Sequence, residues 1–167
     1  MIKIGKNISE FSVYSCQPKT KKELKEIIKN RIRKQGTDCN LNDIDVSLIT
    51  DMSYLFFQSN FNGDISKWNT SNVKSMEGMF AKSDFNGDIS KWDVSKVKEM
   101  SEMFERSEFN QDISGWNTSK VEDMFYMFNK SKFNGDISNW KINNKCCTTD
   151  MFNECSIKEE YKPKLLK

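Results

Sequence analysis

The sequence has 167 residues, of which 37% are hydrophobic and 30% are charged, with a formal net charge of +2. This length suffices for one domain, and a charge so close to zero gives no reason to expect nucleic acid as a partner. The chain has no histidine, which excludes serine or cysteine nucleophiles activated by histidine, and it has no apolar stretch long enough to span a membrane.

The first segment, residues 1–40, is predicted to contain one capping helix. Thr20 and Glu23 have the spacing of a capping box, and the apolar residues after them fall on one side of a helix. These residues are Leu24, Ile27, Ile28 and Ile32. The other side is basic, with eight Lys or Arg against two Glu over 19–34. We interpret the helix as a cap with a solvated basic face, and contact with an anionic surface is the alternative.

A repeat with a period of 24 residues follows over 41–155. Its units lie near 41–60, 61–84, 85–108, 109–132 and 133–155. One column of tryptophans and one of asparagines keep the period: Trp68, Trp92, Trp116 and Trp140, and Asn62, Asn86, Asn110 and Asn134. Such a period indicates stacked units that bury one another's apolar faces.

Each unit is predicted to contain one strand and one helix. Ile89, Trp92 and Val94 lie in a short run typical of a strand. The run of apolar residues at 97, 100, 103 and 104 has the spacing of one helix face. The predicted fold is therefore an α/β solenoid of about five strand–helix units after the N-terminal capping helix, with the four tryptophans stacked inside.

A turn with the sequence "FNGD" joins the units. Its glycine would permit a positive φ, but Gln111 takes the same place in the third unit, so the turn is not expected to need one. The asparagine side chains of the column are expected to form hydrogen bonds with turn backbone. The alternative is that the column forms a row of binding positions for a ligand. Calcium on the aspartate column (64, 88, 112 and 136) is disfavoured because no EF-hand loop is present.

The polar positions between the strand residues are predicted to face outward and form a candidate interaction face. This face comprises Asp43, Asp45, Lys67, Asn69, Lys91, Asp93, Asn117, Asn139 and Lys141. Repeat arrays commonly bind partners through such a face. It has no exposed aromatic anchor, so its composition does not indicate a particular partner.

Residues 156–167 are expected to form a C-terminal lid. The five cysteines show neither a C-x-x-C pair nor a zinc spacing. No apolar core of a signal peptide is seen near Met1. Reduced thiols in a cytoplasmic protein are therefore expected.

The recurring string F-N-x-D-I-S-x-W-[ND]-[TV]-S-x-V-x-x-M-x-x-M-F resembles the BspA-like leucine-rich repeat of bacterial surface proteins and Mycoplasma lipoproteins. The resemblance covers about 41–155, and "PKTKKELKEII" before it resembles a leader common in that family. It implies a right-handed, leucine-rich-repeat-like solenoid and, for the studied members of the family, surface exposure and adhesion. It implies no activity and no functional residue.

We predict a non-catalytic module, a monomer, that binds an unknown protein partner and needs no metal or other cofactor. One alternative is a surface adhesin with an unrecognised export route. A metal-dependent binder or enzyme is the other.

Overall fold

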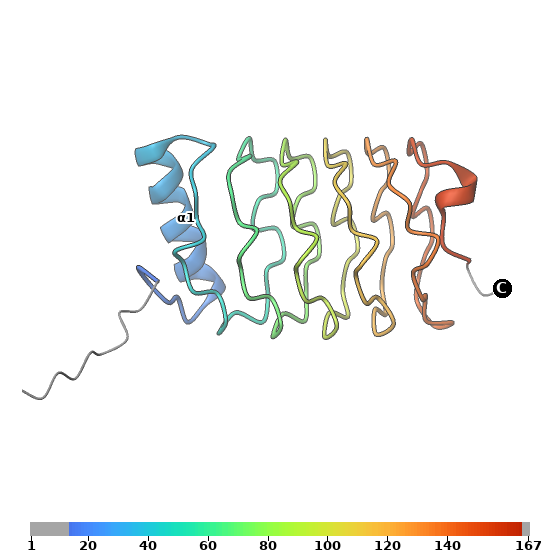
Figure 1. The fold of residues 1–167 in the computed structure, drawn as a ribbon, viewed down its shortest axis with the longest axis horizontal. Coiled ribbons are helices and arrows are strands. Elements are labelled where there is room, and N and C mark those ends of the chain that lie inside the picture. Colours follow the sequence, from blue (N-terminus) through green and yellow to red (C-terminus); the bar gives the residue numbers. More distant parts are fainter. Residues whose placement is uncertain (1–13, 165–167) are drawn as a thin grey trace, which may run out of the picture.

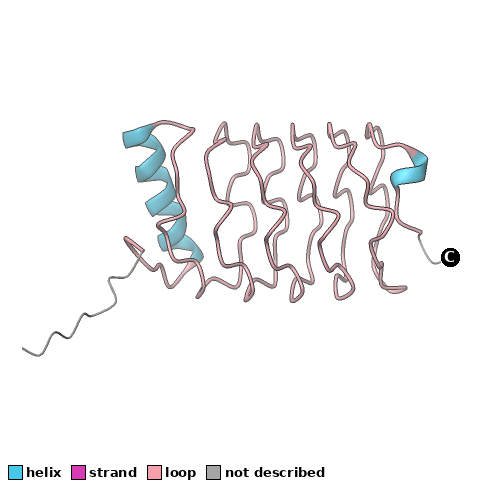
Figure 2. Ribbon diagram, in the orientation of Figure 1, coloured by secondary structure: helices cyan, strands magenta, loops and turns pink. Residues whose placement is uncertain are grey.

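The computed structural model describes residues 14–164. Within that range it contains one α-helix, α1 (Lys21–Gln35), one 3-10 helix, η1 (Glu159–Tyr161), and no β-strand. Between these two elements the chain winds through stacked coils made of turns and loops (Figures 1 and 2). Helix α1 lies at one end of the stack and η1 lies at the other (Figure 1).

The predicted α/β fold, with a strand and a helix in each unit, is wrong. In the segment predicted to be helical, Met103 N donates to the carbonyl of Met100 at 3.3 Å, which closes a β-turn. Glu102 and Arg106 have φ values of 56° and 52°, and an α-helix cannot contain such left-handed residues. A β-turn brings its first and fourth residues close together, so successive turns reproduce the apolar spacing of three that suggested a helix.

The predicted strand is also replaced by turns. Trp92 N donates to the carbonyl of Ile89 at 3.1 Å, and Val97 N donates to that of Val94 at 2.9 Å. Within residues 14–164, parallel pairing occurs only as isolated bridges between coils. One column of these bridges runs through Asp51, Ser75, Glu99, Asp123 and Cys147. The backbone therefore turns too often for a continuous ladder to form.

Hydrogen bonds between neighbouring coils satisfy the remaining backbone groups. The N–H groups of Met100, Glu102 and Phe104 donate to carbonyl oxygens of the next coil at 2.8, 2.8 and 2.9 Å. Since these bonds join residues about one period apart, each coil holds the next in register, as a sheet would.

The core is a set of side-chain columns that run along the stack. Phe80 and Phe104 stack with centroids 5.7 Å apart, and Phe104 and Phe128 stack at 5.5 Å. Trp68 and Trp92 stack at 6.2 Å, as do Trp116 and Trp140. Each of the four tryptophans is only 4% exposed. Repetition thus places like residues on one another across the whole interior.

Each tryptophan also bonds to the coil before it. The indole N–H groups of Trp68, Trp92, Trp116 and Trp140 donate to the carbonyls of Leu41, Ile65, Ile89 and Ile113 at 2.9, 3.1, 3.2 and 3.1 Å. A buried indole needs such an acceptor. The tryptophan column therefore combines packing with polar contacts between coils.

Gly63, in the first "FNGD" turn, allows a close approach to the backbone of Cys39 and does not need a positive φ. Gly63 is absent from the described residues with positive φ. A Cβ atom on Gly63 would lie 2.0 Å from the carbonyl oxygen of Cys39. Gln111, which has a side chain at the same place in the third unit, had led us to expect that this turn needs no positive φ, and Gly63 agrees with that expectation.

Helix α1 begins where the capping box was predicted. The Thr20 side chain accepts a hydrogen bond from Glu23 N at 3.2 Å, and Leu24 and Ile28 are buried in the core. Arg31 binds Asp43 through two bonds of 3.0 Å. The helix is thus fastened to the stack by its apolar side and by a bidentate ion pair.

The end of the described chain lies against the last coil. Ile137 N donates to the carbonyl of Tyr161 at 3.0 Å, and Ile157 is buried. The Lys162 ammonium lies 5.5 Å from the centroid of the Phe152 ring. Residues up to 164 therefore cover the apolar end of the stack.

Candidate functional site

A row of aspartates marks one corner of the coils, and each aspartate closes an Asx turn. The carboxylates of Asp64, Asp88, Asp112 and Asp136 accept the backbone N–H of Ser66, Ser90, Ser114 and Ser138, each at 2.9 Å. The motif D-I-S supplies both partners, because an Asx turn joins a side chain to the amide two residues later. The aspartates therefore hold the corner in shape.

These hydrogen bonds also favour the ionised carboxylates. The backbone N–H and the side chain of Ser90 lower the pKa of Asp88, and those of Ser114 lower the pKa of Asp112. A bond to the charged form of an acid stabilises that form. The row is consequently anionic at neutral pH.

The asparagine column lies beside this row and bonds from coil to coil. The side-chain oxygens of Asn62, Asn86 and Asn110 accept the backbone N–H of Asn86, Asn110 and Asn134, each at 2.8 Å. Their oxygens are thus used inside the stack, so they contribute to the scaffold on which other side chains are displayed.

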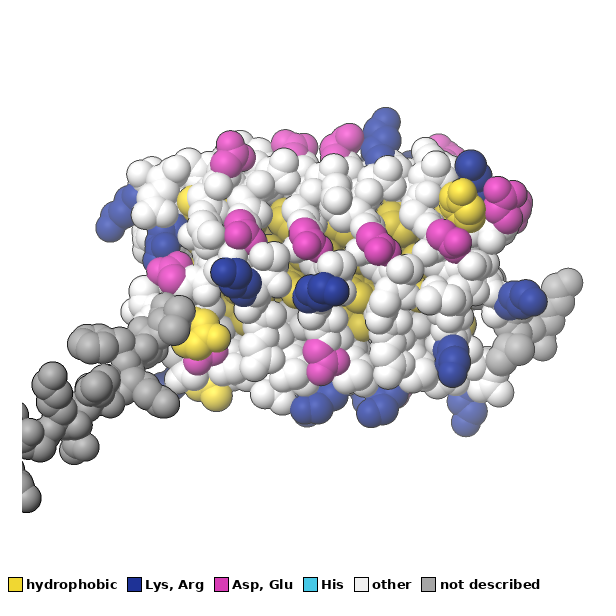
Figure 3. Space-filling model, viewed as in Figure 1, with side chains coloured by type: hydrophobic (Ala, Val, Ile, Leu, Met, Phe, Trp, Pro, Cys, Tyr) yellow, Lys and Arg dark blue, Asp and Glu magenta, His cyan; other side chains and the backbone are white. Residues whose placement is uncertain are grey.

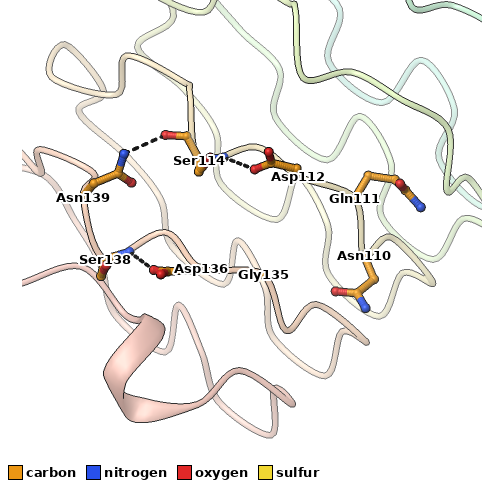
Figure 4. Close-up of a pocket in the computed structure, with 8 residues that line it drawn as sticks. All are labelled: Asn110, Gln111, Asp112, Ser114, Gly135, Asp136, Ser138 and Asn139. Carbon is orange, nitrogen blue, oxygen red and sulfur yellow. Dashed lines mark hydrogen bonds between the residues drawn. The ribbon is translucent and has the colours of Figure 1, made fainter.

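A shallow groove of about 590 Å³ opens at this corner between two coils. Figure 4 shows Asp112 and Asp136, one from each of the two coils, with their bonds to Ser114 and Ser138. Asn139 Nδ2 donates across the groove to the carbonyl of Ser114 at 3.1 Å. Gly135 and Asn, Gln, Asp and Ser residues line the groove, and their polar groups suit it to hydrogen bonding and to a cationic group.

The side chains of the candidate interaction face differ in how far contacts within the chain already engage them. Asp43 is bound to Arg31, and Asp45 accepts Gln17 Nε2 at 2.6 Å. Three further members accept the amide of their own turn: Asn69 from Ser71, Asp93 from Ser95 and Asn117 from Ser119. The side chains of Lys67, Lys91 and Lys141 are exposed. Figure 3 shows acidic side chains recurring along the stack with basic ones beside them.

A second acidic cluster lies on the turns that replace the predicted helix. Partial burial raises the pKa of Glu99, with Asp123 and Glu122 adding to the effect. Burial likewise raises the pKa of Glu102, with Glu105 and Glu77 adding. Like charges brought together by stacked coils penalise ionisation.

No metal centre is assembled within residues 14–164. No group of three His, Cys, Asp or Glu side chains there could hold a metal ion. All five cysteines are free, and burial raises the pKa of the Cys146 thiol to about 11. This raised pKa disfavours the nucleophilic thiolate. No helix in this range is long and apolar enough to cross a membrane.

Sequence reasoning missed a second groove, between α1 and residues 55–60. Its exposed aromatic residue is Phe57. The signal was a break in the repeat, because Ala81, Glu105 and Asn129 occupy the place of Phe57 in the later units. An apolar ring at a position that is otherwise small or polar could have directed attention to this groove.

Comparison with known proteins gives one match. A family model described as "Mycoplasma protein of unknown function, DUF285" matches residues 22–130 and 81–162. The two overlapping matches include nearly all of α1, the coils and η1. No curated protein and no solved structure matches the chain.

Proposed function

We propose that this chain, which belongs to the family of Mycoplasma proteins of unknown function DUF285, is a non-catalytic module that binds a partner protein through the polar face of its coils. The face consists of the exposed members of the candidate interaction face, above all Lys67, Lys91 and Lys141. Function is assigned to the surface because the interior is used for packing.

One observation carries this proposal. Lys67 and Lys91 are exposed at the same position of successive coils, and both project from backbone held by the Asx turns of Asp64 and Asp88. A preorganised backbone loses little conformational entropy when a partner binds. Regularly spaced charges on such a backbone favour a protein surface with complementary spacing.

The absence of histidine from the sequence supports a non-catalytic role. The raised pKa of Cys146 supports it further, since this thiol is a poor nucleophile. Calorimetry with calcium and zinc and a hydrolase screen test the alternative. A metal dissociation constant below about 10 μM, or turnover above background, would favour it.

We also propose, beyond membership of the DUF285 family, that the repeat of this chain is of the BspA-like type. It rests on the string F-N-x-D-I-S-x-W, which recurs in the four units 61–84, 85–108, 109–132 and 133–155, with Gln111 at the variable position in the third of them. A role in adhesion rests on that resemblance alone.

The deciding experiment isolates partners from the native cell and then measures their binding with purified protein. We expect Lys67→Glu/Lys91→Glu to weaken binding at least about tenfold, since repulsion or a lost contact of about 1.4 kcal/mol gives that factor. The matched control is Lys74→Glu/Lys132→Glu, which changes the charge equally at two other exposed positions. Equal effects of the two double variants would refute binding through this face.

A further inference from the structure

The groove between α1 and the first coil forms a surface distinct from the polar face. It has a volume of about 570 Å³, and its walls are five residues of α1 and residues 55–60. It lies at the end of the stack that α1 covers (Figure 1).

One wall of this groove is a basic stripe. Lys25, Lys29 and Arg33 follow one another at intervals of four along α1, and all three are exposed. No carboxylate lines the groove. Lys25 and Lys29 form no ion pair with any residue in 14–164, whereas Lys21 and Arg31 of the same helix pair with Asp51 and Asp43. The charge of the stripe is therefore not neutralised within the described chain.

The other wall offers an apolar contact. Phe57 is 38% exposed, one of three large hydrophobic residues that are exposed in residues 14–164. The Lys82 ammonium lies 5.5 Å from the centroid of its ring. The half-buried Ile32 lines the groove from α1. Lys82 is itself paired with Glu105 at 3.6 Å, but Lys25 and Lys29 on the opposite wall are not paired within residues 14–164. An apolar ring across the groove from these unpaired cations is a surface for a ligand that is both anionic and apolar.

We propose that this groove binds a short, extended, acidic segment of a partner protein. Residues four apart on a helix are separated by about 6 Å along its axis, and alternate residues of an extended chain by about 6.6 Å. Carboxylates at alternate positions therefore match Lys25, Lys29 and Arg33 in turn. The peptide residue between two carboxylates points the other way, toward Phe57. An apolar side chain at that position would pack against the Phe57 ring.

Two other occupants fit less well. The acid–apolar–acid stretch of this chain, at Asp43 and Asp45, has its central Ile44 buried, so a second folded copy cannot present it. A long polyanion such as nucleic acid would meet residues 36–155, which carry 19 acidic and 12 basic groups. Repulsion from that surface favours a short acidic segment.

Selection from a library of random displayed peptides against the whole protein tests the proposal. We expect the enriched peptides to have a net negative charge and an apolar residue between two acidic ones. In 0.1 M salt, Lys25→Glu/Lys29→Glu should bind these peptides at least tenfold more weakly. The neutral variant Lys25→Gln/Lys29→Gln should lose less peptide affinity than the charge reversal. Phe57→Ser should also bind the peptides more weakly than the wild type. Thermal melts establish that each variant is folded.

The control is Lys67→Glu/Lys91→Glu, which should bind the peptides as the wild type does. The same variant probes the polar face, so failure of one proposal is distinguishable from failure of the other. The inference is overturned if no peptide is enriched, if enriched peptides lack negative charge, or if the control loses binding equally. It is also overturned if phosphatidylglycerol vesicles or a single-stranded oligonucleotide bind through Lys25 and Lys29 while peptides do not.

Discussion

At the scale of single residues, one tryptophan side chain connects two neighbouring coils. The Trp92 ring stacks on Trp68 at 6.2 Å, its indole N–H donates to the carbonyl of Ile65 at 3.1 Å, and it packs near Phe80 with centroids 6.1 Å apart. The side chain is 4% exposed. Its removal would empty a large site and remove one of the two hydrogen bonds that the Ile65 carbonyl accepts, the other coming from Trp68 N at 3.2 Å.

We expect Trp92→Ala to lower the free energy of unfolding by about 3–5 kcal/mol, the usual range for a buried aromatic residue. Urea melts followed by circular dichroism provide the measurement. Trp92→Phe is the matched control, since it keeps a ring in the column and loses the indole hydrogen bond, and its cost should be smaller. A melt of the alanine variant equal to that of the wild type would mean that the column does not support the core.

At the scale of elements, left-handed residues set the turns apart from a helix. Glu102 has a φ of 56°, and Gly78, one period earlier, also has a φ of 56°. The position thus already accepts glycine in one coil. A residue other than glycine in this conformation carries a steric cost of roughly 1–2 kcal/mol.

Glu102→Gly should therefore raise the free energy of unfolding by roughly 0.5–1 kcal/mol, after allowing for the greater freedom of glycine in the unfolded chain. A helix at the same place would lose about 1 kcal/mol from the same change. Chemical denaturation distinguishes the two. Glu108→Gly, at an exposed position outside the left-handed set, is the control, and it should bring no gain.

Helix α1 is the other element with a defined role, since it covers the first coil with Leu24 and Ile28. Deleting residues 1–35 should expose Ile44 and Met52, which are now 1% and 0% exposed, along with unpaired backbone groups. Such a surface promotes association. We expect aggregation or loss of cooperative unfolding, measured by gel filtration and thermal melting. A monomeric product with a cooperative melt would show that the helix is not needed as a cap.

At the scale of the whole molecule, stacking turns single charges into rows with opposite effects on pKa. The Asx-turn row has its pKa lowered, as hydrogen bonds from Ser90 and Ser114 do for Asp88 and Asp112. In the second acidic cluster, burial and neighbouring like charges raise the pKa values of Glu99 and Glu102. As pH falls, the acids with raised pKa values should therefore increase the free energy of unfolding, and those with lowered pKa values should decrease it.

We expect the free energy of unfolding to rise modestly as pH falls from 7 toward about 5, and to fall below about pH 4. An acid whose pKa is raised in the folded state takes up its proton there first, so acidification stabilises the fold. An acid whose pKa is lowered stabilises the fold above its unfolded pKa, and that contribution is lost as pH falls through the folded one. Urea melts between pH 7 and 3 measure both effects.

The variant Glu99→Gln/Glu102→Gln is the control for this pH dependence. It should be more stable than the wild type at pH 7 and should lose the rise toward pH 5, while the loss at low pH remains. An unchanged rise would show that these two carboxyl groups are not its cause.

Several features of this protein were predictable from the sequence because they depend on local chemistry or on the period. The first turn of α1 follows from the spacing of Thr20 and Glu23. The inward position of Trp92 follows from its recurrence at a fixed interval. Similarly, the Asx turns follow from D-I-S, in which donor and acceptor lie two residues apart.

The conformation of each unit was decided only by the tertiary structure. An apolar spacing of three suits both a helix and a series of turns, and the choice depends on where the amide of Met100 finds its acceptor. It bonds to Asp123 in the next coil, a partner that no local pattern reveals. The pairing of Asp43 with Arg31 and the groove beside Phe57 are likewise contacts between distant segments. They form only when α1 packs on the first coil, because burial of Leu24 and Ile28 brings these segments together.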